Sequence, residues 1–181
     1  MKRAVTARRR AGFTLIELMV VLGIVAVLAG LAAPSFASMA LRSRLSAQAN
    51  EAVSAALLAR SEAIKRNTTV SMCVSSNGAT CGTGGWEQGY LVMCNTTDNV
   101  SCNDAGTNTL VLRQTPAMTA GLKMTETAGL NRVVFQPTGV GATMGTWTIC
   151  SAAPLGAEER KVRVSSTGRP SVSKETAGVC N

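Results

Sequence analysis

The first part of the chain combines one long apolar run with a helical pattern of apolar positions. Residues 18–41, a stretch of 24 residues, contain no charged side chain, and about 20 apolar residues suffice to cross a hydrocarbon core. Apolar positions then recur near helical spacing, at Leu41, Leu45, Ala49, Val53, Leu57 and Ile64. This pattern predicts one nearly continuous helix over residues 13–66, its first half in a membrane and its second half packed on a domain. An ordinary amphipathic core helix would bury the same stripe of the second half.

After residue 67 the pattern changes to short β-prone runs separated by Gly, Asn, Thr and Ser. The predicted strands are residues 69–74, 89–94, 109–113, 132–136, 146–150, 161–165 and 170–173. A leading helix followed by strands without intervening helices predicts an α+β domain with an antiparallel sheet. About 140 residues follow residue 41, enough for one domain with its own core.

A single carboxylate, Glu17, interrupts the apolar pattern near its start. A charge at that depth in a membrane costs roughly 2.5–3.5 kcal/mol, so Glu17 needs a partner of opposite charge. The residues ahead of it include five bases and no acid: Lys2, Arg3, Arg8, Arg9 and Arg10. This bias predicts that residues 1–12 stay in the cytoplasm and that the remainder is exported.

A secretory signal peptide is the alternative interpretation, because it also has a basic start and an apolar centre. Two features disfavour it. Glu17 lies inside the apolar region, and the small residues at 29–33 run into Pro34, a poor residue to follow a signal-peptidase cut. The sequence therefore favours a membrane-spanning helix.

The start of the apolar run carries a recognisable motif. It reads Gly12-Phe13-Thr14-Leu15-Ile16-Glu17-Leu18. The motif resembles the processing site of type IV prepilins and of the pseudopilins of type II secretion. The resemblance implies that prepilin peptidase cuts after Gly12 and methylates the new amino terminus at Phe13. It also implies that Glu17 attracts the terminal ammonium of a neighbouring subunit during assembly, and that Pro34 takes the place of a helix-kinking proline.

The net charge adds little to this interpretation once residues 1–12, the leader that the peptidase would remove, are left out. The full chain has a formal net charge of +8, and loss of residues 1–12 leaves 13 Lys and Arg against 10 Asp and Glu, a net charge of +3. Total charge alone therefore does not argue for nucleic acid as a partner.

Six cysteines occur in the part predicted to be exported, and an even count there favours disulfides. The simplest pairing has two local pairs with the same eight-residue offset and one distant pair: Cys73 with Cys81, Cys94 with Cys102, and Cys150 with Cys180. The local pairs each enclose turn-forming residues. This connectivity is one of fifteen that six cysteines allow.

The composition disfavours an enzyme. The chain has no histidine, the usual partner of a Ser or Cys nucleophile, and no Cys-x-x-Cys spacing that would indicate zinc. Glu158 and Glu159 could act as paired carboxylates, but we interpret them as a solvated face on an exposed turn. We expect no catalytic residues, no metal and no cofactor.

Four further stretches resemble the FimT/GspH family of minor pilins and pseudopilins. They are residues 59–67, the segment Trp86-Glu87-Gln88-Gly89-Tyr90, the segment Phe135-Gln136-Pro137-Thr138-Gly139, and residues 163–169. The resemblance implies a pilin-like fold: a cleaved leader at 1–12, a transmembrane and assembly half of the helix at 13–41, and an amphipathic half plus a disulfide-containing β domain at 42–181. Core packing is the preferred role of Trp86 and Phe135.

Within the family that this chain resembles, the FimT proteins of competent bacteria are DNA-binding minor pilins that use a C-terminal Gly-Arg-x-Arg loop. This chain reads Gly168-Arg169-Pro170-Ser171, so serine replaces the second arginine. Nearby cations could restore a phosphate-binding patch: Arg160, Lys161, Arg163 and Lys174. Strand alternation puts Lys161 and Arg163 on one face, with Arg160 and any residue beyond the turn directed elsewhere. The alternative interpretation is a solvated basic edge that discourages sheet-to-sheet aggregation.

These features lead to one expectation with one alternative. We expect a FimT-like minor pilin of a type IV pilus in the bacterial inner membrane, with a periplasmic C-terminal domain, and DNA capture for natural transformation as a second hypothesis. The alternative is a GspH-type pseudopilin of a type II secretion system without DNA binding. The expected partners are other pilins or pseudopilins, prepilin peptidase, the inner membrane and, under the second hypothesis, double-stranded DNA.

Overall fold

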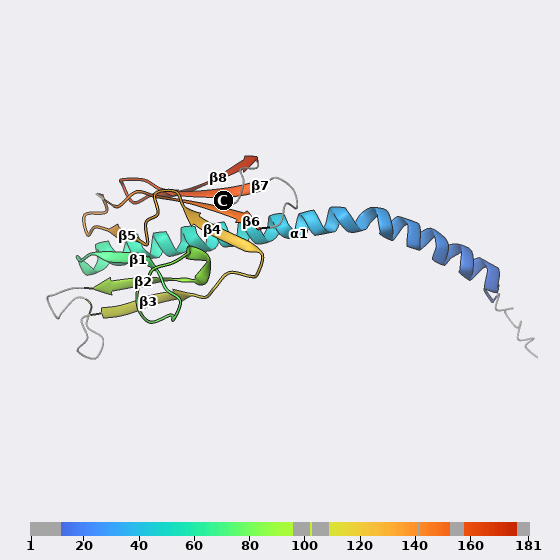
Figure 1. The fold of residues 1–181 in the computed structure, drawn as a ribbon, viewed down its shortest axis with the longest axis horizontal. Coiled ribbons are helices and arrows are strands. Elements are labelled where there is room, and N and C mark those ends of the chain that lie inside the picture. The colour runs from blue at the N-terminus through green and yellow to red at the C-terminus, as the bar shows by residue number, and fades with distance from the viewer. Residues whose placement is uncertain (1–11, 96–101, 103–108, 141, 153–157, 177–181) are drawn as a thin grey trace, which may run out of the picture. The chain divides into compact units, whose positions relative to one another are not determined.

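The computed structural model describes residues 12–95, 102, 109–140, 142–152 and 158–176. The elements in these residues are α1 (Leu15–Arg66), β1 (Val70–Val74), the 3-10 helix η1 (Trp86–Gln88), β2 (Tyr90–Asn95), β3 (Thr109–Thr115), β4 (Leu122–Glu126), β5 (Arg132–Phe135), β6 (Gly145–Ser151), β7 (Glu158–Val164) and β8 (Pro170–Thr176), as Figure 1 shows. The chain divides into two compact units, residues 1–39 and 40–181.

The long helix predicted from the apolar pattern is confirmed, and it ends at the predicted residue. It begins at Leu15, because Thr14 caps it: the backbone N–H of Glu17 donates to Thr14 Oγ1 at 3.3 Å. A threonine three residues before a glutamate is a common helix start, in which the hydroxyl satisfies a backbone donor that has no partner within the helix.

All seven predicted strands are present, with ends that differ by up to three residues. The prediction missed β4, whose sequence LKMTE contains two charged residues in five. Pairing with β6 holds this strand in place, from Leu122 opposite Ser151 to Glu126 opposite Trp147. A short strand at the edge of a sheet depends more on such pairing than on its own sequence preference.

The strands form two four-stranded antiparallel sheets rather than one, with the orders β3-β2-β1-β5 and β4-β6-β7-β8. Figure 1 shows strands β1, β2 and β3 and strands β6, β7 and β8 as separate groups. The second sheet ends in a β7–β8 hairpin, in which Val164 lies opposite Pro170 at one end and Glu158 opposite Thr176 at the other. The α+β class with antiparallel strands is therefore confirmed.

One continuous core joins α1 to both sheets. The residues of α1 that it buries are mostly alanines, with relative exposures of 0–1%: Leu45, Ala49, Ala52, Ala55, Ala56, Ala59 and Ala63. These small side chains form the part of the core that α1 contributes, and the large core side chains come mainly from the sheets, such as Trp147 and Tyr90. Trp86 and Phe135 are also buried, at 2% and 1% exposure, as predicted.

The buried stripe differs from the predicted one toward the end of α1. Val53 is half-buried, and Leu57 and Ile64 are 49% and 50% exposed. The prediction followed four-residue steps, and each such step rotates about 40° beyond a full turn of a helix with 3.6 residues per turn. Successive steps therefore drift off the buried face, which alanines at mixed three- and four-residue spacing follow.

Two of the predicted disulfides are formed. Cys73 bonds to Cys81 and Cys94 to Cys102, with Cα–Cα distances of 5.6 and 5.5 Å. The predicted third pair joins Cys150 with Cys180, and Cys180 lies outside the described residues, so that pairing stays a prediction.

Candidate functional site

The predicted processing site lies where α1 begins. Gly12 is uncrowded by the described part of the chain, because a Cβ atom placed on it would have no other heavy atom of these residues within 4 Å. Phe13 is 85% exposed, and Glu17 is also exposed in the first turn of α1. Among the described residues, no Lys or Arg lies within ion-pairing distance of Glu17.

The apolar side chains from Leu18 to Leu31 are all exposed. Leu18, Val20 and Leu31, for example, are 57%, 54% and 74% exposed. The described residues contain one helix, α1, that is long and apolar enough to cross a membrane. Continuous exposed apolar surface of this length fits a membrane-anchored segment.

The DNA-binding candidates of the β7–β8 hairpin lie on two different sides of the sheet and near two different ends of the hairpin. Val162 and Val164 are buried in the core, so Arg160, at the same parity in β7, lies on their side of the sheet, while Lys161 and Arg163 lie on the outer side. The predicted division between Lys161 with Arg163 and Arg160 is therefore confirmed.

The turn end of the hairpin presents two arginines. Arg163 and Arg169 are both exposed. Arg163 lies directly opposite Ser171 in the β7–β8 register, and Ser171 Oγ donates to the carbonyl oxygen of Arg163 at 3.4 Å. The turn is closed by Ser165, whose N–H donates to Arg169 O at 3.1 Å. Gly168 has a φ of +68°, a conformation that favours glycine.

The open end of the hairpin gathers three cations around Glu158, and we call these four residues the Glu158 cluster. Its Oε1 lies 3.3 Å from Arg42 Nε and 2.9 Å from Lys174 Nζ, and its Oε2 lies 3.6 Å from Arg160 Nη1. The hydrogen bond from Lys174 is the largest effect on the pKa of Glu158 and lowers it. Burial raises this pKa by less, and the charges of Arg42, Lys174 and Arg160, each a smaller effect than burial, lower it.

The interpretation of Glu158 and Glu159 as a solvated turn was wrong. Both belong to β7, Glu158 is paired as described, and Glu159 is only 6% exposed. The charged side chains hid the start of this strand in the sequence, because the pairing with β8 that holds them becomes visible only in the folded chain.

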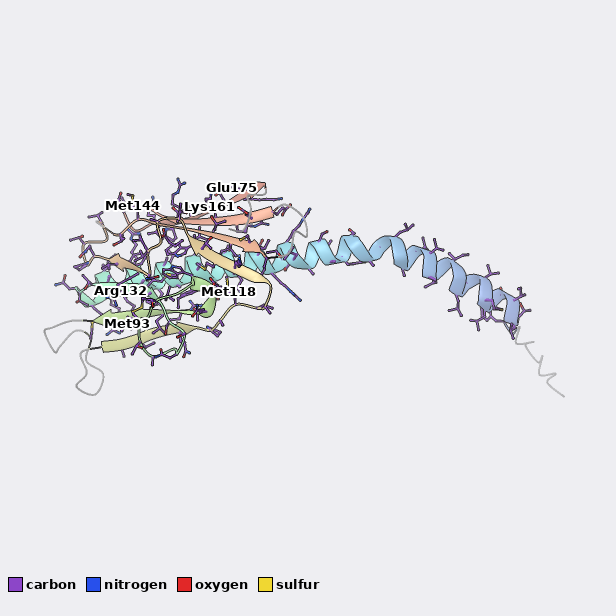
Figure 2. All side chains as sticks on the ribbon, in the orientation of Figure 1. Met93, Met118, Arg132, Met144, Lys161 and Glu175 are labelled. Carbon is purple, nitrogen blue, oxygen red and sulfur yellow. A yellow bond between two sulfur atoms is a disulfide. The ribbon has the colours of Figure 1, made fainter. Side chains whose placement is uncertain are left out.

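Lys161 is also engaged, because it forms an ion pair with Glu175 across the outer side of the hairpin. Figure 2 shows both side chains on neighbouring strands at the top of the view. Of the six DNA-binding candidates, the structure therefore brings Gly168, Arg169 and Arg163 together at the turn, and it places Arg160 and Lys174 in the Glu158 cluster.

Arg60 is a residue whose position the sequence did not reveal. Its Nη2 donates to the carbonyl oxygen of Gly139 at 3.4 Å, and a Cβ atom placed on Gly168 would lie 3.3 Å from Arg60 Cδ. Arg60 thus joins the end of α1 to two turns far apart in the sequence. Three of the stretches that carry the family resemblance meet at Arg60: residues 59–67, 135–139 and 163–169. That shared resemblance was the only hint in the sequence that these stretches lie together.

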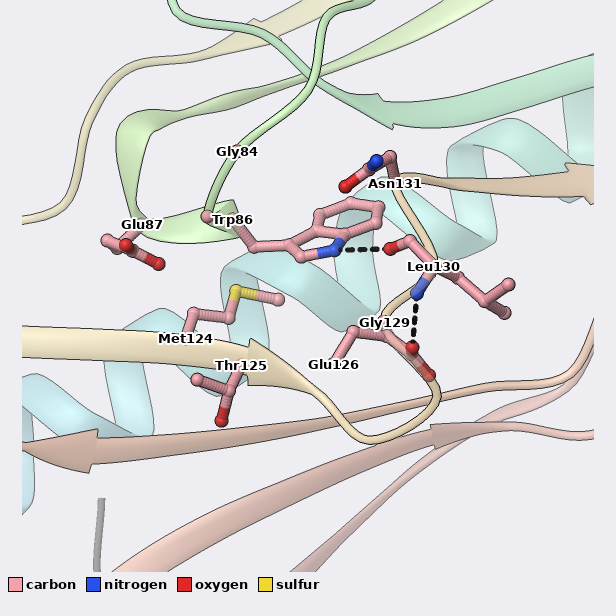
Figure 3. A pocket seen from close by; sticks show the side chains of 10 residues that line it. Gly84, Trp86, Glu87, Met124, Thr125, Glu126, Gly129, Leu130 and Asn131 are labelled. Carbon is pink, nitrogen blue, oxygen red and sulfur yellow. Dashed lines mark hydrogen bonds between the residues drawn. The ribbon is translucent and has the colours of Figure 1, made fainter. Parts of the chain in front are cut away.

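A small pocket of about 230 Å³ lies between η1 and the β4–β5 connection (Figure 3). Its Trp86 donates an indole N–H to Leu130 O at 2.8 Å. Glu126 Oε2 accepts from the N–H groups of Ala128 and Leu130 at 2.8 and 2.7 Å, and Oε1 accepts from Thr146 N–H at 3.1 Å. With three backbone donors on one carboxylate, this glutamate fixes a turn. The described residues contain no group of three His, Cys, Asp or Glu that could hold a metal ion.

Comparisons with known proteins agree with this architecture. The chain matches the family described as type II transport protein GspH over residues 48–168 and the prokaryotic N-terminal methylation motif over residues 7–33. No curated protein matches the chain significantly.

Solved structures of a type IV minor pilin share the fold. Two crystal forms of the type IV minor pilin FimU of Pseudomonas aeruginosa give TM-scores of 0.56 and 0.53 at 20% identity, and the matches cover 77% and 76% of this chain and 97% and 100% of FimU. The minor pseudopilin EpsH of the type 2 secretion system of Vibrio cholerae gives a TM-score of 0.48 at 16% identity, over 75% of this chain and 98% of EpsH.

The likeness to FimU shows a shared fold, and the GspH match, which covers more than half of the chain, shows the family. The methylation motif overlaps the start of α1, where Gly12, Phe13 and Glu17 lie. The chain therefore belongs to the FimT/GspH family, whose members are structural subunits of type IV pili and of type II secretion pseudopili.

Proposed function

We propose that the chain is a FimT-like minor pilin of a type IV pilus. Prepilin peptidase cuts after Gly12 and methylates Phe13, residues 13–41 anchor the subunit in the inner membrane and enter the filament, and residues 42–181 form its periplasmic part. The exposure of Phe13 and the absence of crowding around Gly12 support access by a peptidase.

Assembly rests on Glu17 in this proposal. An exposed carboxylate at the start of an apolar helix is costly in a membrane unless an opposite charge meets it. The ammonium at Phe13 of a neighbouring subunit supplies that charge after cleavage, and the attraction is much stronger in a low-dielectric surrounding than in water. Glu17 thereby directs subunits into one register along the filament.

DNA capture is the second part of the proposal, and one observation carries it. Ser171 stands where the DNA-binding loop of FimT proteins has its second arginine, and Arg163 lies directly opposite Ser171 on the same face of the hairpin. Residues directly opposite in an antiparallel pair have Cα atoms about 4.5–5.5 Å apart. Arg163 can therefore deliver the positive charge that Ser171 lacks, next to Arg169, and phosphate contacts require charge more than one fixed residue.

A mobility-shift titration of duplex DNA over a salt series tests this assignment. The mature chain in detergent micelles is compared with Arg163→Gln/Arg169→Gln and with the matched charge control Arg42→Gln/Lys174→Gln. We expect the first variant to bind more weakly, with a salt slope smaller by about 2, because each lost phosphate contact removes about 1 from the slope. An equal loss in both variants would reduce the effect to net charge, and unchanged affinity of the first variant would contradict DNA capture at the turn.

A GspH-type minor pseudopilin is the alternative, favoured by the family description as a type II transport protein and by Ser171 itself. In that case the turn arginines form a solvated basic edge, and the chain binds no DNA at physiological salt. Removal of the gene would then reduce secretion of exported proteins and leave transformation by DNA unchanged.

A further inference from the structure

The Glu158 cluster carries more positive charge than its carboxylate neutralises. It contains three cations and one anion, and the side chains of Arg42 and Lys174 are 58% and 60% exposed. Arg160 and Glu158, at 11% and 15% exposure, form its less exposed base. An ammonium has three N–H donors and a guanidinium five, so Arg42 and Lys174 retain donors for a ligand beside Glu158.

The base of the cluster is held in place. Arg160 Nε donates to Ser46 Oγ of α1 at 3.2 Å, and its Nη1 donates to the carbonyl oxygen of Glu159 at 3.2 Å. Arg42 Nε and Lys174 Nζ both contact the same oxygen of Glu158. These two cations, from α1 and from β8, are therefore no farther apart than the sum of their two distances to that oxygen.

The position of the cluster along the chain indicates its ligand. Arg42 is the first charged residue after the run that is free of charge from residue 18 to residue 41. In a membrane-anchored chain, the first cation after such a run lies at the membrane surface, where basic side chains reach headgroups. Because Lys174 shares a carboxylate oxygen with Arg42, the fold holds a residue 132 positions later in the sequence at the same level.

From this arrangement we infer that Arg42 and Lys174, on the base formed by Arg160 and Glu158, bind the phosphate of an anionic phospholipid headgroup. The phosphate lies between the two exposed cations and accepts their free N–H groups. The contact ties β8, and with it the β7–β8 hairpin, to the membrane surface before the subunit enters a filament. This inference rests on the proposed membrane anchoring by residues 13–41 and is independent of the proposed capture of DNA.

The turn with Arg163 and Arg169 and the Glu158 cluster lie at opposite ends of the β7–β8 hairpin. Along α1, Arg42 contacts Glu158 at the open end, whereas Arg60 packs beside Gly168 at the turn. Eighteen residues separate these two helix positions, which corresponds to about 27 Å along a helix. A variant at one end therefore serves as the control for the other.

Native mass spectrometry of the full mature chain, released from micelles that contain equal amounts of phosphatidylglycerol and phosphatidylcholine, tests the inference. We expect the parent chain to retain phosphatidylglycerol preferentially and Arg42→Gln/Lys174→Gln to lose roughly 10- to 30-fold of this preference. Arg163→Gln/Arg169→Gln removes the same charge and should keep it. Glu158→Gln should raise the preference, because it removes the competing carboxylate, whereas a purely structural role of the cluster predicts no gain.

Besides the absence of a gain in Glu158→Gln, three results would overturn the inference. The first is an undiminished preference in Arg42→Gln/Lys174→Gln, and the second is an equal loss in both double variants, which would indicate net charge alone. The third is retention of glycerol phosphate, offered without acyl chains, as strongly as the lipid, which would indicate a site for a free phosphate compound. Circular dichroism of each variant at the same temperature confirms that the compared chains are folded.

Discussion

The side chain of Arg60 packs beside the backbone of Gly168, so that the end of α1 supports the turn that displays Arg169. A Cβ atom placed on Gly168 would lie 3.3 Å from Cδ and 3.4 Å from Nε of Arg60. The same guanidinium donates to Gly139 O at 3.4 Å. One helical side chain therefore joins two turns that are separated by about thirty residues in the sequence.

Substitution of Gly168 by alanine should destabilise the domain. The φ of +68° costs an L-residue roughly 1–2 kcal/mol, and the new methyl group would press on Arg60. Gly129→Ala is the matched control, because Gly129 has a φ of +71° and no heavy atom within 4 Å of the added Cβ. Urea unfolding of both variants separates backbone strain from the contact, and equal losses of stability would show that Arg60 contributes nothing.

Restoring an arginine at position 171 should strengthen DNA binding under the proposed function. In Ser171→Arg the new side chain lies opposite Arg163 and near Arg169, and one added phosphate contact should steepen the salt slope by about 0.9. Ser173→Arg adds the same charge on the same face, opposite Lys161 and two residues farther from the turn. Fluorescence anisotropy with labelled duplex DNA measures both, and a gain of the same size in Ser173→Arg would argue against a localised site.

Removal of the Glu17 carboxylate should impair assembly and leave the domain folded. In Glu17→Ala the ammonium of a neighbouring subunit would be buried without a partner, and we expect at least a tenfold lower content of the subunit in filaments, equivalent to about 1.4 kcal/mol. Quantitative mass spectrometry of sheared filaments measures this content, with Glu62→Ala as a control in the same helix. Normal content of the Glu17 variant would refute the role of this carboxylate in assembly.

Glu126 should be a larger source of stability than its place in a small pocket suggests. Its carboxylate accepts three backbone N–H groups, and hydrogen bonds to a charged group contribute about 1.5–3 kcal/mol. Glu126→Gln turns an amide toward these donors, so we expect a loss of about 2–3 kcal/mol in the free energy of unfolding. Glu87→Gln, in the same pocket, should change it by less than about 0.5 kcal/mol. Similar losses in the two variants would contradict this assignment.

Tyr90 should make stability depend on pH in alkaline solution. Burial raises the pKa of Tyr90 to about 12, from 10.0 in the unfolded chain. Its contribution is therefore fully present below pH 10 and is lost as the pH rises toward 12, because the unfolded chain releases this proton first. The loss amounts to about 2–3 kcal/mol at most. Unfolding at several pH values should show a smaller decline for Tyr90→Phe, and identical declines would disprove the effect.

The sequence determined those parts of the structure that depend on local pattern. The charge-free run from residue 18 to residue 41 fixes the apolar part of α1, and alternation with turn residues between runs located seven strands. The equal spacing of Cys73 with Cys81 and of Cys94 with Cys102 indicated two disulfides. Such features are readable because they rest on chain geometry and on contacts between residues close in sequence.

Tertiary structure alone decided the contacts between distant segments. β4 and the start of β7 are rich in charge, and pairing with β6 and β8 holds them as strands despite their composition. The buried face of α1 consists mainly of alanines, whereas the larger Leu57 and Ile64 are about half exposed. Whether Arg163 lies opposite Ser171, or Lys174 beside Arg42, depends on strand register and on packing against the helix. These are cooperative outcomes of the whole fold that no local pattern encodes.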